Sequence, residues 1–328
     1  MINNNIKICV VGGGRWGMNH IKTLDQLSAL GGVVDHDNNI KEIIKKQFKK
    51  CKIFNSLNEA LIDDFDGFIV ATPPRTHYEI AKKIIEHGKA VLVEKPLTLD
   101  LQTAKSLNEL AIHHNVNLMV GHVLLFHPAF QKMKSIIDDG RLGQIQYIYS
   151  NRLNLGTFRT DENVFWSFAP HDISLLNYFF NDKPINVTSR GVDILQKNIH
   201  DTTITTFDYE NNRMGHIFVS WLHPFKEHRF VIVGSNGMLH FEDSTEGKPL
   251  ILYDKKAEFN GDVPNPKSGK IIEIPYENLA PLTNELDYFI SKIQGGNIEI
   301  ASGESAVDVI ALLEKSSKSL KNNDLKRF

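Results

Sequence analysis

Short apolar runs alternate with amphipathic segments through roughly the first 120 residues. The runs typical of buried strands are Ile6–Val11, Val33–Val34, Phe68–Ala71, Val91–Val93 and Leu118–Val120. The segments between them have helical spacing: Trp16, Ile21, Leu24 and Leu27 on one face, an exposed basic helix over Glu42–Lys50, then Ile80–Ile85 and Leu101–Asn115. Apolar strands separated by amphipathic helices require a parallel sheet covered on both faces. Residues 1–121 are therefore predicted to form a doubly wound α/β domain of the Rossmann type.

The pattern changes from about residue 122, where apolar and polar residues begin to alternate. Ile145, Tyr147 and Tyr149 alternate with polar neighbours, as in a strand that buries one face. Further strands are predicted at Asn186–Ile194, Thr202–Tyr209, Met214–Trp221, Arg229–Val233 and Met238–Phe241, with a hairpin turn at Asn236-Gly237. Lys255–Lys270 is the most loop-like stretch, and two helices, around Leu282–Ile293 and Val307–Leu313, close the chain. Residues 122–328 are predicted to be an α+β domain with a large open antiparallel sheet.

Composition narrows the class of protein. A length of 328 residues suits two domains, and 41% hydrophobic with 23% charged residues is the balance of a folded chain. A net charge of -2 offers no argument for nucleic acid or for an anionic membrane surface. No apolar run approaches the ~20 residues of a membrane helix, and the N-terminus lacks the features of a signal peptide. Two cysteines cannot make a disulfide framework, so we expect a cytoplasmic protein.

A glycine motif follows the first predicted strand. Gly12-Gly13-Gly14-Arg15-Trp16-Gly17 satisfies G-x-G-x-x-G, opens a helix, and precedes an acidic residue about 20 residues later. Glycine allows the tight turn and the close approach of a pyrophosphate, and the helix N-terminus supplies free N–H donors for it. The alternative is a structural turn. The motif predicts a dinucleotide site that includes Gly12, Gly14, Arg15, Trp16 and Gly17.

Asp35, at the end of the second strand, bears on the choice of cofactor. Its carboxylate can accept both ribose hydroxyls of NAD. A 2′-phosphate would meet a like charge, costing about 4 kcal/mol at roughly 4 Å and an effective dielectric constant of about 20. NAD is therefore the predicted cofactor. Thr72 and Pro73 fall at the ligand-binding edge of the sheet and His77 just beyond them, where it could equally be a helix-capping residue.

Glu94-Lys95-Pro96 follows another buried strand at the same edge. The proline restricts the backbone around Lys95. A lysine beside a bound nicotinamide would lie next to a positive ring and lose water, and both effects disfavour the ammonium form. Such an amine suits proton exchange with a hydroxyl as hydride leaves the same carbon. The alternative is an ordinary surface lysine in a loop.

Together with Ala169-Pro170-His171-Asp172, these motifs resemble the glucose–fructose oxidoreductase, inositol dehydrogenase and MocA family over essentially the whole chain. The resemblance implies a two-domain NAD(P)-dependent enzyme that oxidises or reduces a secondary alcohol of a sugar or cyclitol. It implies that Lys95 and His171 handle the proton, that Glu94 and Lys95 lie at the cofactor, and that the Lys95–Pro96 peptide is cis. It also suggests a homodimer or homotetramer through the antiparallel sheet, because apolar sheet faces usually meet a partner.

Two positions depart from the family pattern. Ser167 stands where relatives commonly have an aspartate, four residues before His171, and Leu125 stands where they often have arginine. Pro170 is well suited to the first position of a helix, which would place His171 in the first turn. The positive helix end there would keep the imidazole neutral and available as a base. We therefore expect His171 to take a larger share of the proton transfer than Lys95.

Polar residues before and around His171 indicate the substrate. The candidate substrate-binding residues are Arg152, Asn154, Arg159, Trp166 and Asp172. Arginine suits bidentate contacts to phosphate, although a solvated strand end would explain the same residues. The segments Asn-Arg-Leu-Asn-Leu-Gly and Trp-Ser-Phe-Ala-Pro-His-Asp-Ile are similar to those of the nucleotide-sugar branch of the family. That branch oxidises a ring hydroxyl, often at C3 of UDP-N-acetylglucosamine, for surface polysaccharide biosynthesis.

Three other functions fit the same residues. In an inositol or free-sugar dehydrogenase, Arg152 and Arg159 would have no substrate phosphate to bind. An NAD-recycling glycosidase would return its hydride in each cycle and form no net NADH. A non-catalytic NAD-binding sensor would keep its function without Lys95. No metal is expected, because none of the fourteen histidines lies in H-E-x-x-H or beside paired cysteines.

Overall fold

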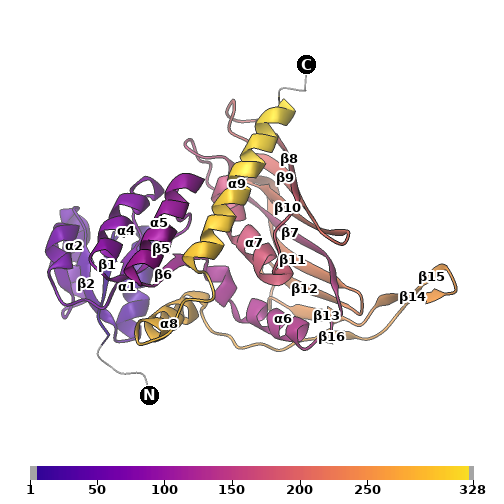
Figure 1. The fold of residues 1–328 in the computed structure, drawn as a ribbon, viewed down its shortest axis with the longest axis horizontal. Helices are drawn as coiled ribbons and strands as arrows, with labels where there is room; N and C mark the ends of the chain where they lie inside the picture. The colour runs from indigo at the N-terminus through magenta and orange to yellow at the C-terminus, as the bar shows by residue number, and fades with distance from the viewer. Residues whose placement is uncertain (1–5, 325–328) are drawn as a thin grey trace. The chain divides into compact units, whose positions relative to one another are not determined.

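A computed structural model describes residues 6–324, which fall into two compact units (Figure 1). The first unit comprises the described residues up to 126 together with 279–311, and the second comprises 127–278 and the described residues from 312 on. The boundary predicted at residue 121 did not anticipate that 279–311 return to the first unit. Each unit has its own buried core.

The first unit is a six-stranded parallel sheet in the order β3-β2-β1-β4-β5-β6. Its strands are β1 (Ile8–Val11), β2 (Leu30–Val34), β3 (Lys52–Phe54), β4 (Gly67–Val70), β5 (Ala90–Glu94) and β6 (Leu118–Gly121). Its helices are α1 (Arg15–Gln26), α2 (Asn38–Gln47), α3 (Leu57–Leu61), η1 (Pro74–Thr76), α4 (His77–Glu86), α5 (Leu101–His114), η2 (Val123–Phe126), α8 (Pro281–Ile293) and the first part of α9 (Gly303–Asp324). The predicted doubly wound fold is confirmed. The short β3 and α3 were not predicted.

The order of the strands positions the site. The chain leaves β1 toward β2 and β3 on one side, and β4, β5 and β6 lie on the other. Right-handed crossovers place the helices of the two halves on opposite faces, and in open sheets ligands bind where the order reverses, at the carboxyl ends of the strands. That edge carries the glycine motif after β1 and the Glu94-Lys95-Pro96 element at the end of β5.

The second unit contains an eight-stranded sheet in the order β16-β13-β12-β11-β7-β10-β9-β8. Its strands are β7 (Ile145–Leu155), β8 (Asn186–Val192), β9 (Thr202–Tyr209), β10 (Arg213–Ser220), β11 (Leu222–Gly234), β12 (Met238–Glu242), β13 (Leu250–Tyr253) and β16 (Ile271–Glu273). Its helices are α6 (Pro128–Asp138), α7 (Val164–Phe180) and the later part of α9 (Gly303–Asp324). The sheet is antiparallel as predicted except for the parallel pair β7 and β10.

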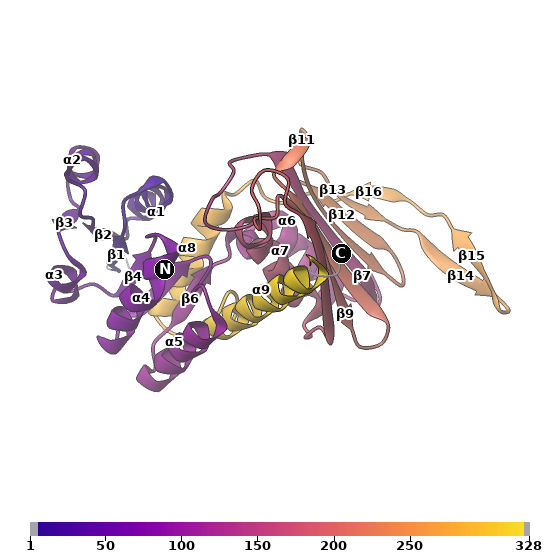
Figure 2. The ribbon, with the colours of Figure 1, turned by 90° about the horizontal axis from the view of Figure 1, so that it is seen from above.

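Helices cover one face of this sheet, and α6 and α7 lie on that side in both ribbon views (Figure 2). On β7, the side chains buried on the helical side are those of Ile148 and Ser150. Tyr147 and Tyr149 alternate with them and point to the other face, where they are only half-buried. The predicted alternation is present, but the face assumed to be buried is the open one within a single chain.

Residues predicted to be loop-like form a β-hairpin. β14 (Lys256–Asn260) pairs with β15 (Val263–Lys267), and Figure 1 shows the pair extending beyond the large sheet. The prediction of a loop was wrong: in a two-stranded ribbon both strands are edge strands, which tolerate Pro264 and Pro266. Among the helices of the described residues, none has the length and apolarity needed to cross a membrane.

Candidate active site

The glycine motif forms the tight turn that its spacing predicts. Gly12 has a φ of +97°, and a Cβ on Gly17 would lie 1.9 Å from the Gly12 carbonyl oxygen. Only glycine fits position 17, because the first turn of α1 lies directly on the loop. Gly14 caps the helix, and a Cβ there would meet nothing within 4 Å. The first turn of α1 has no acidic residue. Open space at a helix N-terminus that lacks a side-chain cap fits a pyrophosphate.

Asp35 is joined directly to the glycine turn. Its Oδ2 accepts a hydrogen bond from the Gly13 N–H at 2.7 Å, and its Oδ1 accepts one from the Asp37 N–H at 2.8 Å. The carboxylate is mostly buried. The pairing fixes the distance between the turn that would hold the pyrophosphate and the residue that would meet the ribose. This arrangement fits the predicted binding of NAD.

His77 ties two loops of the ligand-binding edge together. Its Nδ1 lies 2.8 Å from the Pro96 carbonyl oxygen and its Nε2 lies 2.8 Å from that of Thr72. His77 is the first residue of α4, whose N-cap is Thr76, so it does not cap the helix. Burial lowers its pKa, although the two carbonyl groups oppose this shift. His77 therefore positions the Thr72-Pro73 turn, and contact with the cofactor stays a prediction for all three residues.

Glu94 is buried at the end of β5 and is held from α1. Its Oε1 accepts a hydrogen bond from the Trp16 indole N–H and lies 2.6 Å from the Nε2 of His20. Burial alone would raise the pKa of Glu94, but hydrogen bonds from His20 and Trp16, with the charge of Lys95, hold it below its ordinary value. Trp16 is 43% exposed, so its predicted place on the buried face of α1 is wrong. That face carries His20, Ile21 and Leu24 instead.

Lys95 follows Glu94 at the carboxyl end of β5, and the Lys95–Pro96 peptide is cis, as the resemblance implied. The neighbouring strand β6 ends at Gly121, opposite Glu94. Burial lowers the pKa of the next residue, His122, to about 4, against the opposing charge of Glu94. A charged amine and a carboxylate thus act on a neutral imidazole at this edge.

His171 lies on α7, but its place in the helix differs from the prediction. The helix begins at Val164 and is capped by Asn163, whose Oδ1 accepts a hydrogen bond from the Trp166 N–H at 3.1 Å. Pro170 lies inside the helix, and His171 is two turns from its start. The expected effect of the helix end on His171 is therefore wrong, because that field falls off within the first turn. Ser167 shares a helical face with His171.

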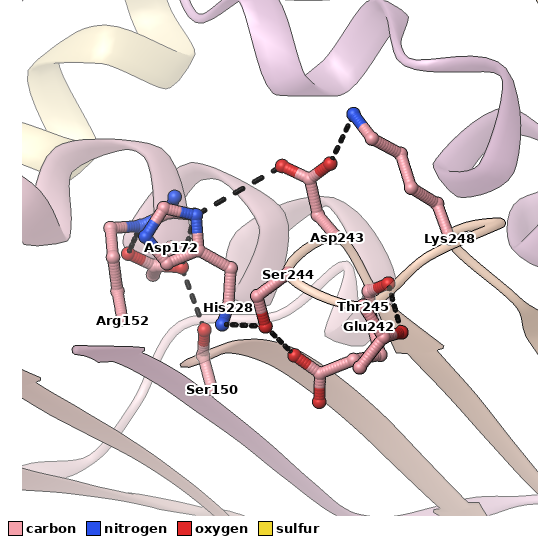
Figure 3. A network of polar contacts seen from close by, with 9 residues as sticks. All are labelled: Ser150, Arg152, Asp172, His228, Glu242, Asp243, Ser244, Thr245 and Lys248. Atoms are coloured by element: carbon pink, nitrogen blue, oxygen red, sulfur yellow. Dashed lines mark hydrogen bonds and ion pairs between the residues drawn. The ribbon is translucent and has the colours of Figure 1, made fainter. Parts of the chain in front are cut away.

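Asp172 faces away from His171, into the second unit. It is fully buried and accepts hydrogen bonds from the Ser150 hydroxyl at 2.7 Å and from the Arg152 Nε at 2.8 Å. The Arg152 Nη2 donates a further hydrogen bond at 2.9 Å (Figure 3). Burial would lower the pKa of Arg152, but its pairing with Asp172 raises it. Both predicted substrate residues are committed to fixing α7 on β7, and a role in binding substrate stays a prediction.

A second group of polar side chains continues from this pair. Figure 3 shows the imidazole of His228, on β11, beside Arg152 and Asp172. The His228 Nδ1 lies 3.9 Å from Asp243, which pairs with the Lys248 Nζ at 2.6 Å. Burial lowers the pKa of His228. A polar network thus runs from the buried Asp172 through the half-buried His228 and Asp243 to the exposed Lys248.

The remaining candidates of this unit differ in exposure. Arg159 is exposed, and its Nε lies 3.8 Å from the Glu162 Oε1, too long for a strong ion pair. The Asn154 side chain lies over Gly156. The Trp166 indole N–H donates to the Ser317 hydroxyl of α9 at 2.8 Å, so it anchors α7. Among the described residues, the Asn154 Oδ1 is buried without a hydrogen-bond partner, while the exposed Arg159 guanidinium has only this long contact to Glu162.

Three buried residues of the first unit were not predicted. His20 contacts Glu94, the charge of Glu94 acts on His122, and Glu285 on α8 is fully buried. The spacing of Trp16 and His20 by four residues would have placed both on one helical face. Glu285 falls among Leu282, Leu286 and Phe289, and a lone carboxylate on an apolar face is a readable signal. Within residues 6–324, no three metal-binding side chains cluster.

Comparison with known protein families places the chain. Residues 6–122 match the family model described as oxidoreductase family, NAD-binding Rossmann fold, and residues 130–240 match the GFO/IDH/MocA C-terminal domain. The chain belongs to the GFO/IDH/MocA oxidoreductase family. NAD is the cofactor of this enzyme, as predicted from Asp35. Its relatives include dehydrogenases that act on sugar hydroxyls.

Individual relatives of this oxidoreductase are distant. It is 29% identical to UDP-N-acetylglucosamine 3-dehydrogenase of Acidithiobacillus ferrooxidans over 56% of this chain and 57% of the relative. It is 24% identical to the scyllo-inositol 2-dehydrogenase (NAD(+)) of Bacillus subtilis, over 79% and 80%. A solved structure of the Acidithiobacillus enzyme has a TM-score of 0.86 at 22% identity and covers 98% of this chain and 99% of that one. GenD2 of gentamicin A biosynthesis, solved with NAD, has a TM-score of 0.82 at 22% identity, covering 98% and 96%.

Proposed function

We propose that this oxidoreductase oxidises a secondary ring hydroxyl of a nucleotide sugar, giving a 3-keto product from a substrate like UDP-N-acetylglucosamine, in surface polysaccharide biosynthesis. The observation that carries the proposal is the edge of the parallel sheet, where the glycine turn, Asp35 and Lys95 follow three different strands. The similarity to the Acidithiobacillus enzyme in sequence supports the substrate class. When bound, the nicotinamide accepts the hydride.

Lys95 and His171 are the proposed proton-handling residues, one in each unit. Lys95 follows a buried strand and is backed by the ionised Glu94, which lies 2.6 Å from His20. His171 lies on α7 next to Asp172, and hydrogen bonds from Ser150 and Arg152 fix Asp172 to the sheet. One of the two accepts the hydroxyl proton as the carbinol carbon is oxidised.

Turnover assays with UDP-N-acetylglucosamine, free N-acetylglucosamine and inositols test the proposal. We expect NADH formation with the nucleotide sugar and loss of about a hundredfold or more in kcat for Lys95→Met or His171→Ala. NADH formation with an inositol alone would favour the second candidate, which the longer match to the Bacillus enzyme supports. Sugar turnover without net NADH would favour a recycling glycosidase. Tight NAD binding with no turnover would favour a sensor.

Arg159 is the arginine we propose for the nucleotide phosphates. It is exposed on the loop between β7 and α7, whereas the Arg152 guanidinium is bound to Asp172. Arg159→Met should raise KM about tenfold for UDP-N-acetylglucosamine and leave KM for a free sugar unchanged, since only the former carries phosphate. An equal effect on both substrates would argue that Arg159 supports the loop.

We further propose a homodimer or homotetramer through the open face of the large sheet. Half-buried side chains of neighbouring strands share this face, among them Tyr149, Val231 and His240. The Tyr149 and His216 rings stack there with centroids 5.3 Å apart. An apolar and aromatic sheet face of this kind is suited to a second copy of the chain. Light scattering that shows only monomer at micromolar concentration would refute it. We place the enzyme in the cytoplasm, which suits its free thiols Cys9 and Cys51.

A further inference from the structure

Glu285 is the most unusual ionisable residue of the first unit. It lies on α8, has no exposed surface, and is flanked by the buried Leu286 and Phe289. Within the described part of the chain, neither carboxyl oxygen of Glu285 has a hydrogen-bond partner. An isolated carboxylate in such a place would cost far more free energy than a neutral acid. The structure therefore favours Glu285 in its protonated form.

Glu94 is the charged group that acts on Glu285. The Glu94 carboxylate lies over Gly121, where a Cβ would be only 2.9 Å from its Oε2, and it is bound by Trp16 and His20 from α1. Helix α8 packs against α1 and against η2, the segment that follows His122. The Asn284 amide N–H donates to the Phe126 carbonyl at 3.1 Å and fixes α8 in this place.

Glu94 and Glu285 differ in the groups that stabilise a negative charge on the carboxylate. Burial would raise the pKa of both, but Glu94 has hydrogen bonds from His20 and Trp16 and a neighbouring charge on Lys95, which lower it. Glu285 has only burial and the charge of Glu94, and both raise its pKa. The other ionisable groups around Glu94 are His20 from α1, His77 from α4, Lys95 after β5 and His122 after β6. Two carboxylates at one buried site repel each other at a high cost in free energy, so one of the two groups stays protonated.

We propose that Glu285 is a positioning residue that acts on Lys95 through Glu94, the two carboxyl groups holding one proton between them. Glu94 keeps the negative charge that faces Lys95, and Glu285 keeps the proton. At neutral pH one buried negative charge, that of Glu94, then acts on the Lys95 ammonium group. A second negative charge appears only when alkali removes the proton from Glu285. The inference rests on the role of Lys95 in the proposed function, and it adds a group that controls the charge of that amine.

Two measurements on the NAD-loaded enzyme, made without sugar, test the inference separately from the substrate. Infrared spectroscopy at neutral pH reports the C=O stretching band of protonated carboxyl groups. Trace acetylation with acetic anhydride, followed by mass spectrometry of the peptide that holds Lys95, reports the titration of this amine. The variants are Glu285→Gln, Glu285→Met as a second neutral side chain, and Glu94→Gln. Glu109→Gln, an exposed position on α5, is the matched control.

The wild type and Glu109→Gln should show the protonated carboxyl band, and both Glu285 variants should lose it. At neutral pH, Lys95 in Glu285→Gln should react within about twofold of the wild type, while Glu94→Gln should react about tenfold faster, one pKa unit of change. In alkali, Lys95 of Glu285→Gln should titrate at lower pH and react about threefold faster than the wild type, since no second charge appears.

Three results would overturn the inference. The first is a band that Glu94→Gln removes and Glu285→Gln retains, or no band at all, since the proton would then not lie on Glu285. The second is a neutral-pH rate for Glu285→Gln that matches Glu94→Gln. The third is loss of the band with an unchanged Lys95 titration at every pH, which would make Glu285 a structural residue. Retained NAD binding shows that the variants fold.

Discussion

Arg152 holds Asp172 through two parallel hydrogen bonds, Nε to Oδ2 at 2.8 Å and Nη2 to Oδ1 at 2.9 Å. The pair joins β7 to α7 at the residue next to His171. Because Asp172 is fully buried, its charge depends on this partner. The planar fork of arginine is needed for both hydrogen bonds at once, and lysine cannot reproduce it. The sheet thereby sets the orientation of the helix that carries a proposed proton-handling residue.

Arg152→Lys should therefore lower the free energy of unfolding by about 2 kcal/mol, measured by urea denaturation. It should also lower kcat more than it changes KM, because His171 loses its support. Arg190→Lys, an exposed site on β8, is the matched control and should change neither quantity. A large rise in KM for the nucleotide sugar, with stability unchanged, would instead mean that Arg152 binds the substrate.

Gly17 and Gly14 should respond differently to alanine. Gly17→Ala forces a Cβ against the Gly12 carbonyl oxygen, so it should destabilise the protein without cofactor and abolish NAD binding. Gly14→Ala has open space and an ordinary φ of -61°, so the free protein should keep its Tm. Its methyl group would stand where the phosphates are expected, and the Kd for NAD should rise about tenfold. Calorimetry of both variants measures Tm and the Kd for NAD. Equal NAD affinity of Gly14→Ala and the wild type would contradict the proposed phosphate position.

Asp35→Ser tests the basis of cofactor choice. Removing the carboxylate removes the like charge that a 2′-phosphate would meet, so the preference for NAD over NADP should fall by up to about three decades. NAD affinity should fall as well, because the ribose loses an acceptor and the Gly13 N–H loses its 2.7 Å hydrogen bond. Titration calorimetry with both cofactors measures the ratio. A preserved ratio would show that another residue excludes NADP.

The regular parts of the fold were predictable, because Val and Ile runs that must be buried on both faces can form only a covered parallel sheet. The start of α7 was not, since Pro170 has the usual properties of a first helical residue, and only the Asn163 side chain at Trp166 reveals the true cap. The return of α8 to the first unit is a tertiary event with no local signal. Glu285 is a different case, because its signal, one acid among Leu282, Leu286 and Phe289, was present in the sequence and was missed.

Acid should destabilise the fold partly through His122. Its pKa falls from an ordinary 6.5 to about 4 because of burial. Between these values the unfolded chain binds a proton that the folded chain does not, so stability is complete above pH 6.5 and declines as the pH falls toward 4. The loss amounts to about 3 kcal/mol at the lower end. Urea denaturation across this range should show a shallower decline for His122→Gln and an unchanged one for the exposed control His113→Gln.

The open sheet face yields the last prediction. Val231 lies at its centre on β11, between Tyr149 of β7 and His240 of β12, and is half-buried in a single chain. A second copy seated there would bury Val231 completely, and a carboxylate at this position would then lose its water with no partner. Val231→Glu should therefore be monomeric by light scattering where the wild type is not, with its Rossmann unit still binding NAD. Thr160→Glu, on an exposed loop, adds the same charge and should leave the assembly intact. An unchanged mass for Val231→Glu would move the subunit contact to another surface, of which the exposed hairpin β14–β15 is the first to test.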